Sequence, residues 1–341
     1  MTPLAQDHPP PFLLKRARRN RQSPAMRTLS QENTLSASDL VAPCFVKEGL
    51  REKEPIAHLP GVCRFPPEAL LREAERLHKK NIPALALFPS IPRHLKDPQG
   101  SEAYNPNGII PRTIARLKQE LPSLALIADV ALDPYTSHGH DGIATTTDTI
   151  DNDQTLEALA RQAVVCARAG ADILAPSATM DGRVRTLRLA LDANGLTHAA
   201  ILSYTAKYAS AFYTPFRTAI ETTLQFGDKA SYQLNPFNRR EALREARLDE
   251  DEGADMLLVK PALPYLDVLT MIRAQTTLPI GAYQVSGEYA MVMAAAAQGY
   301  LDPQATLYEM LAGIKRAGAD FIVTYAAPTL VDVLNSANLS S

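Results

Sequence analysis

Eight short β-prone runs alternate along the chain with segments whose apolar residues recur at helical spacings, and this alternation limits the choice of fold more than any other feature. The runs are Leu40–Val46, Ala84–Phe88, Leu124–Val130, Asp172–Pro176, Ala200–Tyr204, Met256–Lys260, Ile280–Gln284 and Phe321–Tyr325. Helices are expected between several of them, at Pro67–Lys80, Thr155–Ala169, Arg239–Glu252 and Pro303–Ala317. Because the runs are apolar along nearly their whole length, they are typical of a parallel sheet that is buried on both faces.

Three of the helix-to-strand corners carry the same tripeptide, Gly-Ala-Asp, which begins at Gly170, Gly253 and Gly318. A glycine just past a helix end supplies the left-handed turn that caps the helix, so the tripeptide marks the corner of a repeating strand-then-helix unit. Eight such units favour an α/β fold of the (β/α)8 TIM-barrel type over an open doubly wound sheet. The first run is also not followed by the Gly-x-Gly-x-x-Gly motif of a dinucleotide-binding sheet.

The segment before the barrel, residues 1–35, is expected to be an extended N-terminal arm, which leaves 36–341 as one catalytic domain. The arm starts Pro-rich and continues with the basic run KRARRNR at 15–21. Such a run also suits a phosphate-binding tail or a targeting presequence. The formal net charge of the chain is only −2, and no nucleic-acid-binding module follows the run, so no nucleic-acid partner is expected.

The apolar stretches and the cysteines bear on where the protein works. No stretch approaches the ~18 apolar residues of a membrane-spanning helix, and the N-terminus lacks the apolar core of a secretory signal. Cys44, Cys63 and Cys166 are far apart in the chain, which offers no disulfide framework and fits a reducing compartment. We therefore expect a cytoplasmic protein without a membrane partner, with a plastid presequence left as an alternative.

Two lysines stand at the carboxyl ends of neighbouring runs, where barrel enzymes collect their functional residues. Lys207 follows the fifth run and Lys260 ends the sixth, after four apolar residues. Two ammonium groups ~4–6 Å apart repel each other by a few kcal/mol at an effective dielectric of about 20, and burial acts in the same direction. One amine is therefore expected to be neutral, and a neutral amine attacks carbonyl groups, so the pair predicts Schiff-base chemistry.

The loop after the third run, DVALDPYTSHGHDG at 129–142, is rich in carboxylates and imidazoles. Asp129, Asp133 and Asp141 invite a metal site, but the absence of cysteine favours Mg²⁺, a monovalent cation or no metal over tetrahedral zinc. The carboxylates can equally steer an ammonium group or tune an acid–base pair. For His138 and His140 we expect ordinary hydrogen bonds within the loop.

The connection between the fifth and sixth runs, residues 208–238, is unusually long and carries many aromatic residues together with Arg217 and Lys229. A connection of this length in a barrel is often a lid, and cations on a closing flap suit an anionic substrate. The alternative is an aromatic stripe that packs a satellite core.

Four long blocks resemble the porphobilinogen synthases, also called 5-aminolevulinate dehydratases. They are SYTAKYASAFYTPFR (203–217), VKPALPYLD (259–267), YQVSGEYAM (283–291) and DVALDPYTSHGHDG (129–142). The resemblance implies condensation of two 5-aminolevulinate molecules to porphobilinogen with loss of two waters. It also implies homo-octamers that exchange with smaller assemblies and an N-terminal arm that wraps a neighbouring subunit.

The same resemblance implies roles for individual residues. Lys260 would form the Schiff base with the substrate that ends on the propionate side, and Lys207 the Schiff base on the acetate side. Apart from the resemblance, the carboxylate cluster itself makes Asp129, Asp133 and Asp141 candidates for contacting the substrate, with Asp129 and Asp133 as candidates for receiving its amino group or shuttling protons. A Schiff-base aldolase on the same fold is the nearest alternative, but it needs only one lysine.

Two further groups of residues would hold the substrate carboxylates. By resemblance, Ser286 and Tyr325 would hold one carboxylate, while Arg217 and Lys229 would hold the other from the lid. Gln233 follows in the same lid block. A guanidinium binds a carboxylate through a fork of donors, which gives the second assignment its own physical sense.

The resemblance also concerns metals. Zinc-dependent members carry three cysteines at the positions of Ala131, Asp133 and Asp141, so this chain resembles the aspartate-type members and no catalytic zinc is expected. Those members use a regulatory Mg²⁺ at a subunit interface, and Glu245 matches its glutamate. The family's first acid in the loop after the fourth run is replaced by Ala178, so no acid–base role is expected there.

Overall fold

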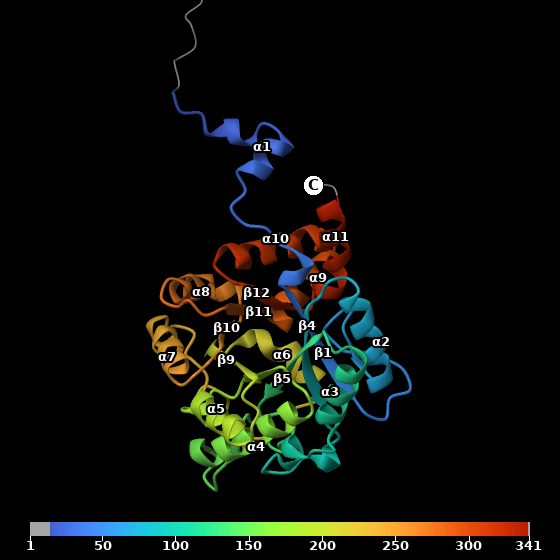
Figure 1. Cartoon of the computed structure of the whole chain (residues 1–341), viewed down its shortest axis with the longest axis vertical. Coiled ribbons are helices and arrows are strands. Elements are labelled where there is room, and N and C mark those ends of the chain that lie inside the picture. Colours follow the sequence, from blue (N-terminus) through green and yellow to red (C-terminus); the bar gives the residue numbers. More distant parts are fainter. Residues whose placement is uncertain (1–13, 340–341) are drawn as a thin grey trace, which may run out of the picture. The chain divides into compact units, whose positions relative to one another are not determined.

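The structure is a computed structural model that describes residues 14–339 and divides the chain into two units, Met1–Thr34 and Leu35–Ser341 (Figure 1). Residues 1–13 of the expected arm lie outside the described residues. In the first unit the basic run forms the 3₁₀ helix η1 (Ala17–Arg21), followed by the short helix α1 (Pro24–Leu29). Ser23 caps α1, because its side chain accepts a hydrogen bond from the N–H of Met26 at 3.2 Å.

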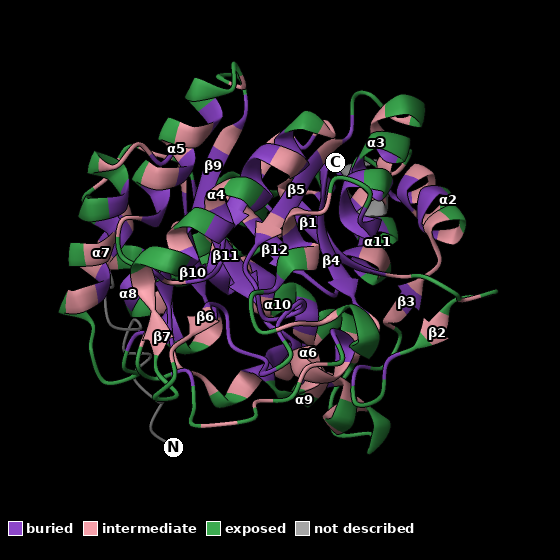
Figure 2. Cartoon of the chain, turned by 90° about the horizontal axis from the view of Figure 1, so that it is seen from below, coloured by how far each residue is buried: buried purple, intermediate pink, exposed green. Residues whose placement is uncertain are grey.

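Parallel strands of the second unit close into a barrel, since β1 pairs with β4 on one side and with β12 on the other. Among the described residues, eight strands make this ring. They are β1 (Leu40–Lys47), β4 (Ala84–Ser90), β5 (Ala125–Val130), β8 (Ile173–Pro176), β9 (Ala200–Lys207), β10 (Met256–Lys260), β11 (Ile280–Gln284) and β12 (Phe321–Thr324). All the predicted runs are confirmed, and Figure 2 shows these strands buried while the surrounding helices expose their outer faces.

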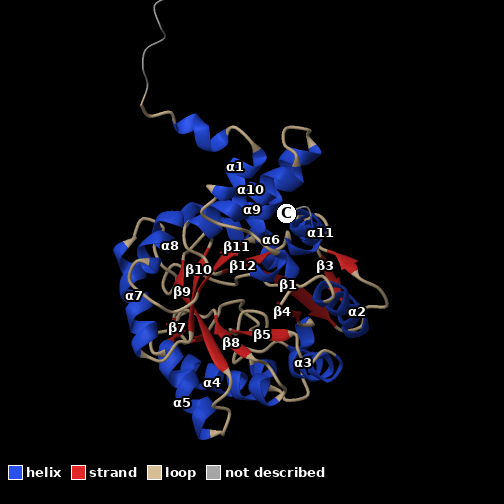
Figure 3. Ribbon diagram, turned by 45° about the horizontal axis from the view of Figure 1, so that its top comes forward, coloured by secondary structure: helices blue, strands red, loops and turns tan. Residues whose placement is uncertain are grey.

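Helices surround the strands (Figure 3). They are α2 (Pro67–His78), α3 (Ile109–Glu120), α4 (Asn152–Arg168), α5 (Arg183–Ala193), α6 (Thr214–Ala219), α7 (Arg240–Asp251), α8 (Leu266–Arg273), α9 (Ser286–Ala297), α10 (Pro303–Arg316) and α11 (Ala327–Leu339). The short strands are β2 (Glu54–Pro55), β3 (Cys63–Phe65), β6 (Ile143–Ala144) and β7 (Ile150–Asp151). No helix within the described part of the chain is long and apolar enough to cross a membrane.

The repeated Gly-Ala-Asp tripeptide turns the chain and also joins strands. Its glycines have φ values of +106°, +100° and +115° at Gly170, Gly253 and Gly318. The aspartate then clips the new strand to its neighbour: the Asp255 carboxylate accepts the N–H of Ile201 at 2.7 Å, and the Asp255 N–H donates to the Ile201 carbonyl at 3.0 Å. The aspartates of the other two copies make the same pair of bonds, Asp172 with Leu126 and Asp320 with Ile280.

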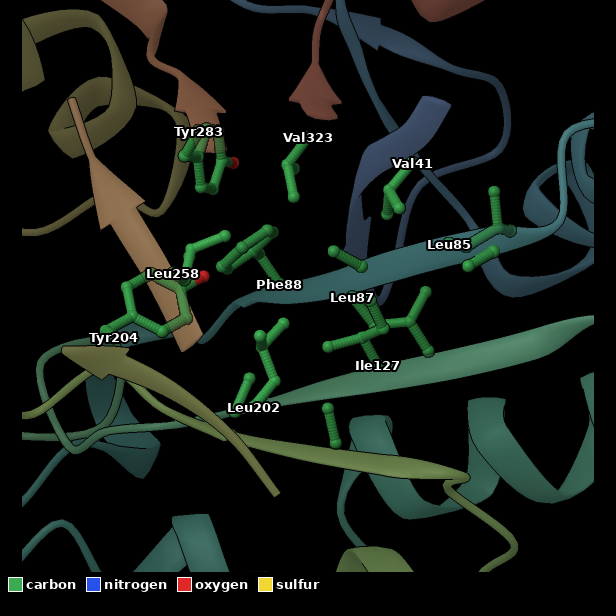
Figure 4. Packing of buried hydrophobic residues seen from close by; sticks show 14 of the residues in the cluster. Val41, Leu85, Leu87, Phe88, Ile127, Leu202, Tyr204, Leu258, Tyr283 and Val323 are labelled. Carbon is green, nitrogen blue, oxygen red and sulfur yellow. The ribbon is translucent and has the colours of Figure 1, made fainter. Parts of the chain in front are cut away.

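The interior of the barrel changes character along the strands (Figure 4). Aliphatic side chains such as Ile127 and Leu258 fill its middle, where they are almost completely buried. Nearer the carboxyl ends of the strands, the inward-facing residues are Phe88, Tyr204 and Tyr283. The apolar packing stabilises the ring, and the aromatic layer forms the floor of the site above it.

Candidate active site

Lys207 and Lys260 are the last residues of neighbouring strands and lie opposite each other in register. The sequence placed Lys207 beyond the fifth strand, but β9 runs three residues further than predicted and ends at this lysine. An irregularity brings the two together: Ser203 pairs with Leu257 and Ala206 with Val259, so β9 has one residue more than β10 between these pairs. Such a bulge shifts the alternation of side chains, which lets Tyr204 and Lys207 share the inner face.

The ammonium group of Lys260 lies among aromatic rings. Its Nζ is 4.5 Å from the ring centre of Tyr283, 5.0 Å from Phe216 and 5.1 Å from Tyr204. Tyr213 adds a fourth ring at 5.3 Å. Burial, and then the charge of Lys207, lowers the pKa of Lys260 to about 7, so much of this amine is neutral and nucleophilic near pH 7.

Lys207 lies among oxygen atoms instead. Its Nζ donates to the Asp141 carboxylate at 3.0 Å and to the Ser177 carbonyl at 2.6 Å. The other oxygen of Asp141 accepts a short hydrogen bond from Lys229 of the lid, which also pairs with Asp133 at 2.9 Å. Asp141 is completely buried, yet the two lysines hold the pKa of its carboxyl well below the usual range.

Asp129, on β5, is the third acid of this cluster. Burial, and then the charge of Asp133, raises its pKa to about 7, while Ser177 and the two strand-end lysines act in the opposite direction. One of its carboxylate oxygens has no hydrogen-bond partner among the described residues. The acids therefore divide: Asp141 stays ionised between two lysines, and Asp129 can gain or lose a proton near pH 7.

Two residues are expected to bind the first carboxylate: Ser286, two residues after the end of β11, and Tyr325, directly after β12. Both are buried at the same end of the barrel. The Ser286 hydroxyl accepts the N–H of Phe216 at 3.0 Å and donates to the Phe212 carbonyl at 3.3 Å. The Tyr325 hydroxyl lies 3.2 Å from that of Tyr283. Both candidates therefore contact the aromatic side of the site.

The segment 208–238 covers the carboxyl ends of the strands and contains α6. Arg217, Lys229 and Gln233 line one cavity there. Arg64 of β3 anchors the segment, because its guanidinium donates to the Ala219 carbonyl at 2.7 Å and to the preceding one at 2.5 Å. Phe216 of this segment packs on rings inside the barrel mouth and not in a separate satellite core, because its ring centre lies 5.3 Å from that of Phe88.

The two loop histidines make hydrogen bonds to other segments, and His140 bonds the lid. The ring nitrogens of His140 are 3.0 Å from the Tyr232 hydroxyl and 3.0 Å from the Phe226 carbonyl, and the ring stacks on Phe226 at 4.3 Å. A ring nitrogen of His138 lies 3.2 Å from the Pro98 carbonyl, and its Nδ1 accepts the N–H of His140 at 3.2 Å. Ordinary hydrogen bonds are thus confirmed for both rings, but Pro98, Phe226 and Tyr232 lie outside the loop in which the partners were expected. The described residues contain no group of three or more His, Cys, Asp or Glu side chains able to hold one metal ion.

Glu245, the expected magnesium ligand, lies on α7 away from the lysines. It is half-buried and pairs with Arg244 at 3.1 Å, and burial raises the pKa of its carboxyl. Mg²⁺ keeps several waters and is often bound through one or two carboxylates, so a single glutamate is compatible with it. Tetrahedral zinc does not fit at Asp133 and Asp141, since both carboxylates are paired with lysines.

The loop after β8 has a structural role. Asp181 is exposed, and Arg183 forms a buried ion pair with Asp249 at 2.8 Å that joins α5 to α7. Ala178 is completely buried, so an acid at this position would need its own partner.

Sequence reasoning missed Tyr204 and Tyr283 as members of the site. Tyr283 lies one residue before the end of β11, and inner-facing aromatic residues next to a strand end were an available signal. Tyr204 gave no such signal, because it lies three residues from Lys207 and an unbroken strand would place the two on opposite faces. Only the bulge puts both at the same amine.

Known proteins are similar to this chain in sequence and in fold. The family model for delta-aminolevulinic acid dehydratase matches residues 14–333. The chloroplastic delta-aminolevulinic acid dehydratase of Glycine max is 51% identical over 327 residues, which cover 96% of this chain and 78% of that protein. The delta-aminolevulinic acid dehydratase of Chlamydia pneumoniae is 50% identical over 323 residues, covering 95% of this chain and 97% of its own. The Toxoplasma gondii enzyme, solved with its reaction product porphobilinogen, aligns with a TM-score of 0.92 at 48% identity over 94% of this chain and 92% of its own. The chain therefore belongs to the delta-aminolevulinic acid dehydratase family.

Proposed function

We propose that this chain condenses two molecules of 5-aminolevulinate to porphobilinogen in tetrapyrrole biosynthesis. The observation that carries the proposal is the pair of strand-end lysines, Lys207 and Lys260, which lie in register. The amine of Lys260 lies among aromatic rings, and that of Lys207 is ion-paired with the Asp141 carboxylate. A Schiff-base aldolase would leave the second lysine without a role. Membership of the family supports the same activity.

Both lysines act as covalent carriers in the proposed reaction. Lys260 condenses with the ketone of one substrate and Lys207 with that of the other, and each imine releases one water. The carbon next to one imine loses a proton and attacks the other imine carbon, which forms the carbon–carbon bond. The amino group of one substrate displaces the lysine from the remaining imine; elimination of the second lysine and a last proton loss then complete the pyrrole. Two waters leave in total, and both lysines return as amines.

Holding two small ketoacids in the right orientation can contribute ~7–11 kcal/mol to such a reaction. We assign one carboxylate to Ser286 and Tyr325 and the other to Arg217, with Lys229 and Gln233 beside it in the lid cavity. Lys229 is already paired with Asp133 and Asp141, so its main contribution is to hold the lid closed. For proton transfer we assign Asp129, whose pKa of about 7 suits the task.

We further propose that the chain is an aspartate-type member without catalytic zinc. Ala131, Asp133 and Asp141 stand where zinc-dependent members carry cysteines, and the chain's own cysteines are in β1, β3 and α4. Mg²⁺ would bind at Glu245 as a regulator, with a monovalent cation as the alternative. Activity that is unaffected by EDTA and by added Mg²⁺ would refute the magnesium proposal. Loss of activity with a zinc-selective chelator would refute the proposal that the chain lacks catalytic zinc.

For the arm we propose subunit contacts within a homo-octamer. Its apolar residues Leu14, Met26 and Leu29 are 76%, 38% and 81% exposed, which leaves apolar area for a partner. Deletion of residues 1–34 should reduce the assembly size in native mass spectrometry. Salt-sensitive RNA binding that is lost on the same deletion would favour a nucleic-acid role instead. We place the enzyme in the cytoplasm, which fractionation of the source cells would test.

The decisive test of the main proposal uses 5-aminolevulinate as the sole substrate. Porphobilinogen should form with two substrates consumed for each product. Borohydride added during turnover should reduce the imines and fix substrate to Lys260 and Lys207, as located by peptide mass spectrometry. Absence of the pyrrole, or adducts at other lysines, would overturn the assignment.

A further inference from the structure

A buried glutamate joins the end of β10 to the start of α9. Glu288 is the third residue of α9 and its side chain is completely buried. The carboxylate accepts hydrogen bonds from the N–H groups of Val285 at 2.6 Å, Leu263 at 2.7 Å and Ala262 at 3.4 Å. One side chain therefore connects two segments that follow different strands, and each segment carries a residue of the active site.

The first segment is the main chain directly after Lys260. The carbonyl of this lysine accepts the N–H of Tyr208 at 3.0 Å. Pro261 has no N–H, so the next donors are those of Ala262 and Leu263, and within the described part of the chain the glutamate is their only acceptor. The position of the lysine backbone is thus set by the lid on one side and by this carboxylate on the other.

The second segment leads back to the same amine. Val285, which donates to Glu288, precedes Ser286, and the hydroxyl of Ser286 holds the N–H of Phe216. The Phe216 ring lies 5.0 Å from the Nζ of Lys260. The contacts therefore connect the backbone after Lys260, through the Glu288 carboxylate and α6, to the Phe216 ring beside the amine of the same lysine.

The carboxylate has no cation to balance it: no ion pair of the described residues involves Glu288, and three backbone dipoles are its partners. Burial raises its pKa to about 7, the direction expected for a carboxylate that loses its hydration without a nearby cation. A buried carboxylate of this kind is expensive, and an apolar residue would pack at lower cost.

We propose that Glu288 is the positioning residue that holds Lys260 inside its aromatic cage. This cage consists of the rings of Tyr204, Tyr213, Phe216 and Tyr283. Glu288 touches neither substrate nor the amine and acts through the main chain of 262–263 and the helix start at Ser286. The inference rests on the proposed Schiff base at Lys260 for its link to catalysis, but the geometry that it predicts can be measured without substrate.

The test is competitive labelling of the full-length protein with acetic anhydride between pH 5 and 10, with peptide mass spectrometry to follow Lys260 and Lys207 separately. In the unaltered protein, labelling of Lys260 should have its midpoint near pH 7. E288Q offers one acceptor oxygen in place of two and points an N–H₂ group at backbone donors. The end of β10 should then move and admit water, which raises the Lys260 midpoint by about one pH unit or more. We expect kcat to fall about tenfold with it.

E288D keeps the charge but is shorter by one methylene, so it should give an intermediate midpoint and covers the case in which E288Q does not fold. The matched control is E68Q, which alters an exposed acid in the first turn of α2 and should leave the midpoint unchanged. A purely structural role would lower the melting temperature without moving the midpoint. A folded E288Q or E288D protein with the original midpoint overturns the proposal. Failure to form porphobilinogen in the unaltered protein would instead refute the proposed function and leave the labelling result standing.

Discussion

The two lysines leave neighbouring strands at the same level of the barrel, yet their surroundings are opposite. Lys260 lies among four aromatic rings, while Lys207 is ion-paired with Asp141 and bonded to a backbone carbonyl. Strand position alone would make the two amines equivalent. The difference comes from the neighbouring elements: β9, β11 and the lid place aromatic rings around Lys260, and the loop after β5 places the Asp141 carboxylate at Lys207.

The different surroundings of the two lysines suit an amine chemistry that is used twice, once for each substrate. An amine that is already neutral can attack the first ketone without a base, whereas an ion-paired amine needs its proton removed before it reacts. The aromatic side and the carboxylate side therefore predict different consequences for mutation.

The largest effect should come from removing the nucleophile on the aromatic side. K260M should lower kcat by roughly 10⁴–10⁶-fold, as expected when a covalent nucleophile is lost. Substrate adducts trapped by borohydride should disappear at position 260. The companion variant K207M should also lose most turnover but keep a single-substrate adduct at Lys260. An active K260M enzyme would contradict the division of roles.

The carboxylate side is tested by D141N, which removes the one acid shared by Lys207 and Lys229. Breaking a buried pair of this kind costs ~3–5 kcal/mol, so the urea midpoint and kcat should both fall strongly. D133N is the matched control, because Asp133 pairs with Lys229 alone and should cost less.

The pH dependence of the D141N effect has a definite sign. The folded-state pKa of Asp141 is depressed, so its stabilisation is fully present above the unfolded-state pKa and is lost as pH falls through the folded value. The difference in stability between the unaltered and D141N proteins should therefore be constant from pH 6 to 8 and begin to narrow only below about pH 4. Urea midpoints that differ equally at pH 7 and pH 3.5 would contradict this.

How much of this arrangement could be read from the sequence depends on the range of the interactions. The strands and the Gly-Ala-Asp corners follow local patterns, and both were predicted. Lys260 was identified as a charged residue at the end of a buried strand, and this signal is also a local sequence pattern. The pairing of Lys229 with Asp133 and Asp141 was not predicted, because residues about 90 positions apart meet only after the lid has closed. The bulge in β9 leaves no trace in composition or periodicity.

A smaller effect should come from G287A, which acts on the aromatic side alone. A Cβ at Gly287 would lie 2.6 Å from the carbonyl oxygen and 2.8 Å from the Cα of Phe212, so the lid backbone must shift. Displacement of the ring next to Lys260 should lower kcat by about ten- to a hundredfold. G313A is the control: its Cβ would meet only the end of a flexible arginine in α10, so activity should stay unchanged and stability rise slightly.

The smallest effect concerns stability and follows from the lowered pKa of Lys260, about 7 in the folded protein. Between pH 7 and the unfolded-state value near 10.5, the unfolded chain binds a proton at this lysine that the folded protein does not. The slope of stability against pH is proportional to that difference, so this group makes the folded protein more stable as pH rises, by at most about 1.4 kcal/mol per pH unit. K260M lacks the group, so its stability relative to the unaltered protein should be greatest at pH 6.5 and decline towards pH 9. K79M, at the exposed lysine that follows α2, should show no such decline. Parallel curves for K260M and the unaltered protein would mean that the folded and unfolded chains bind the Lys260 proton equally, and the aromatic cage would then not be what distinguishes the two amines.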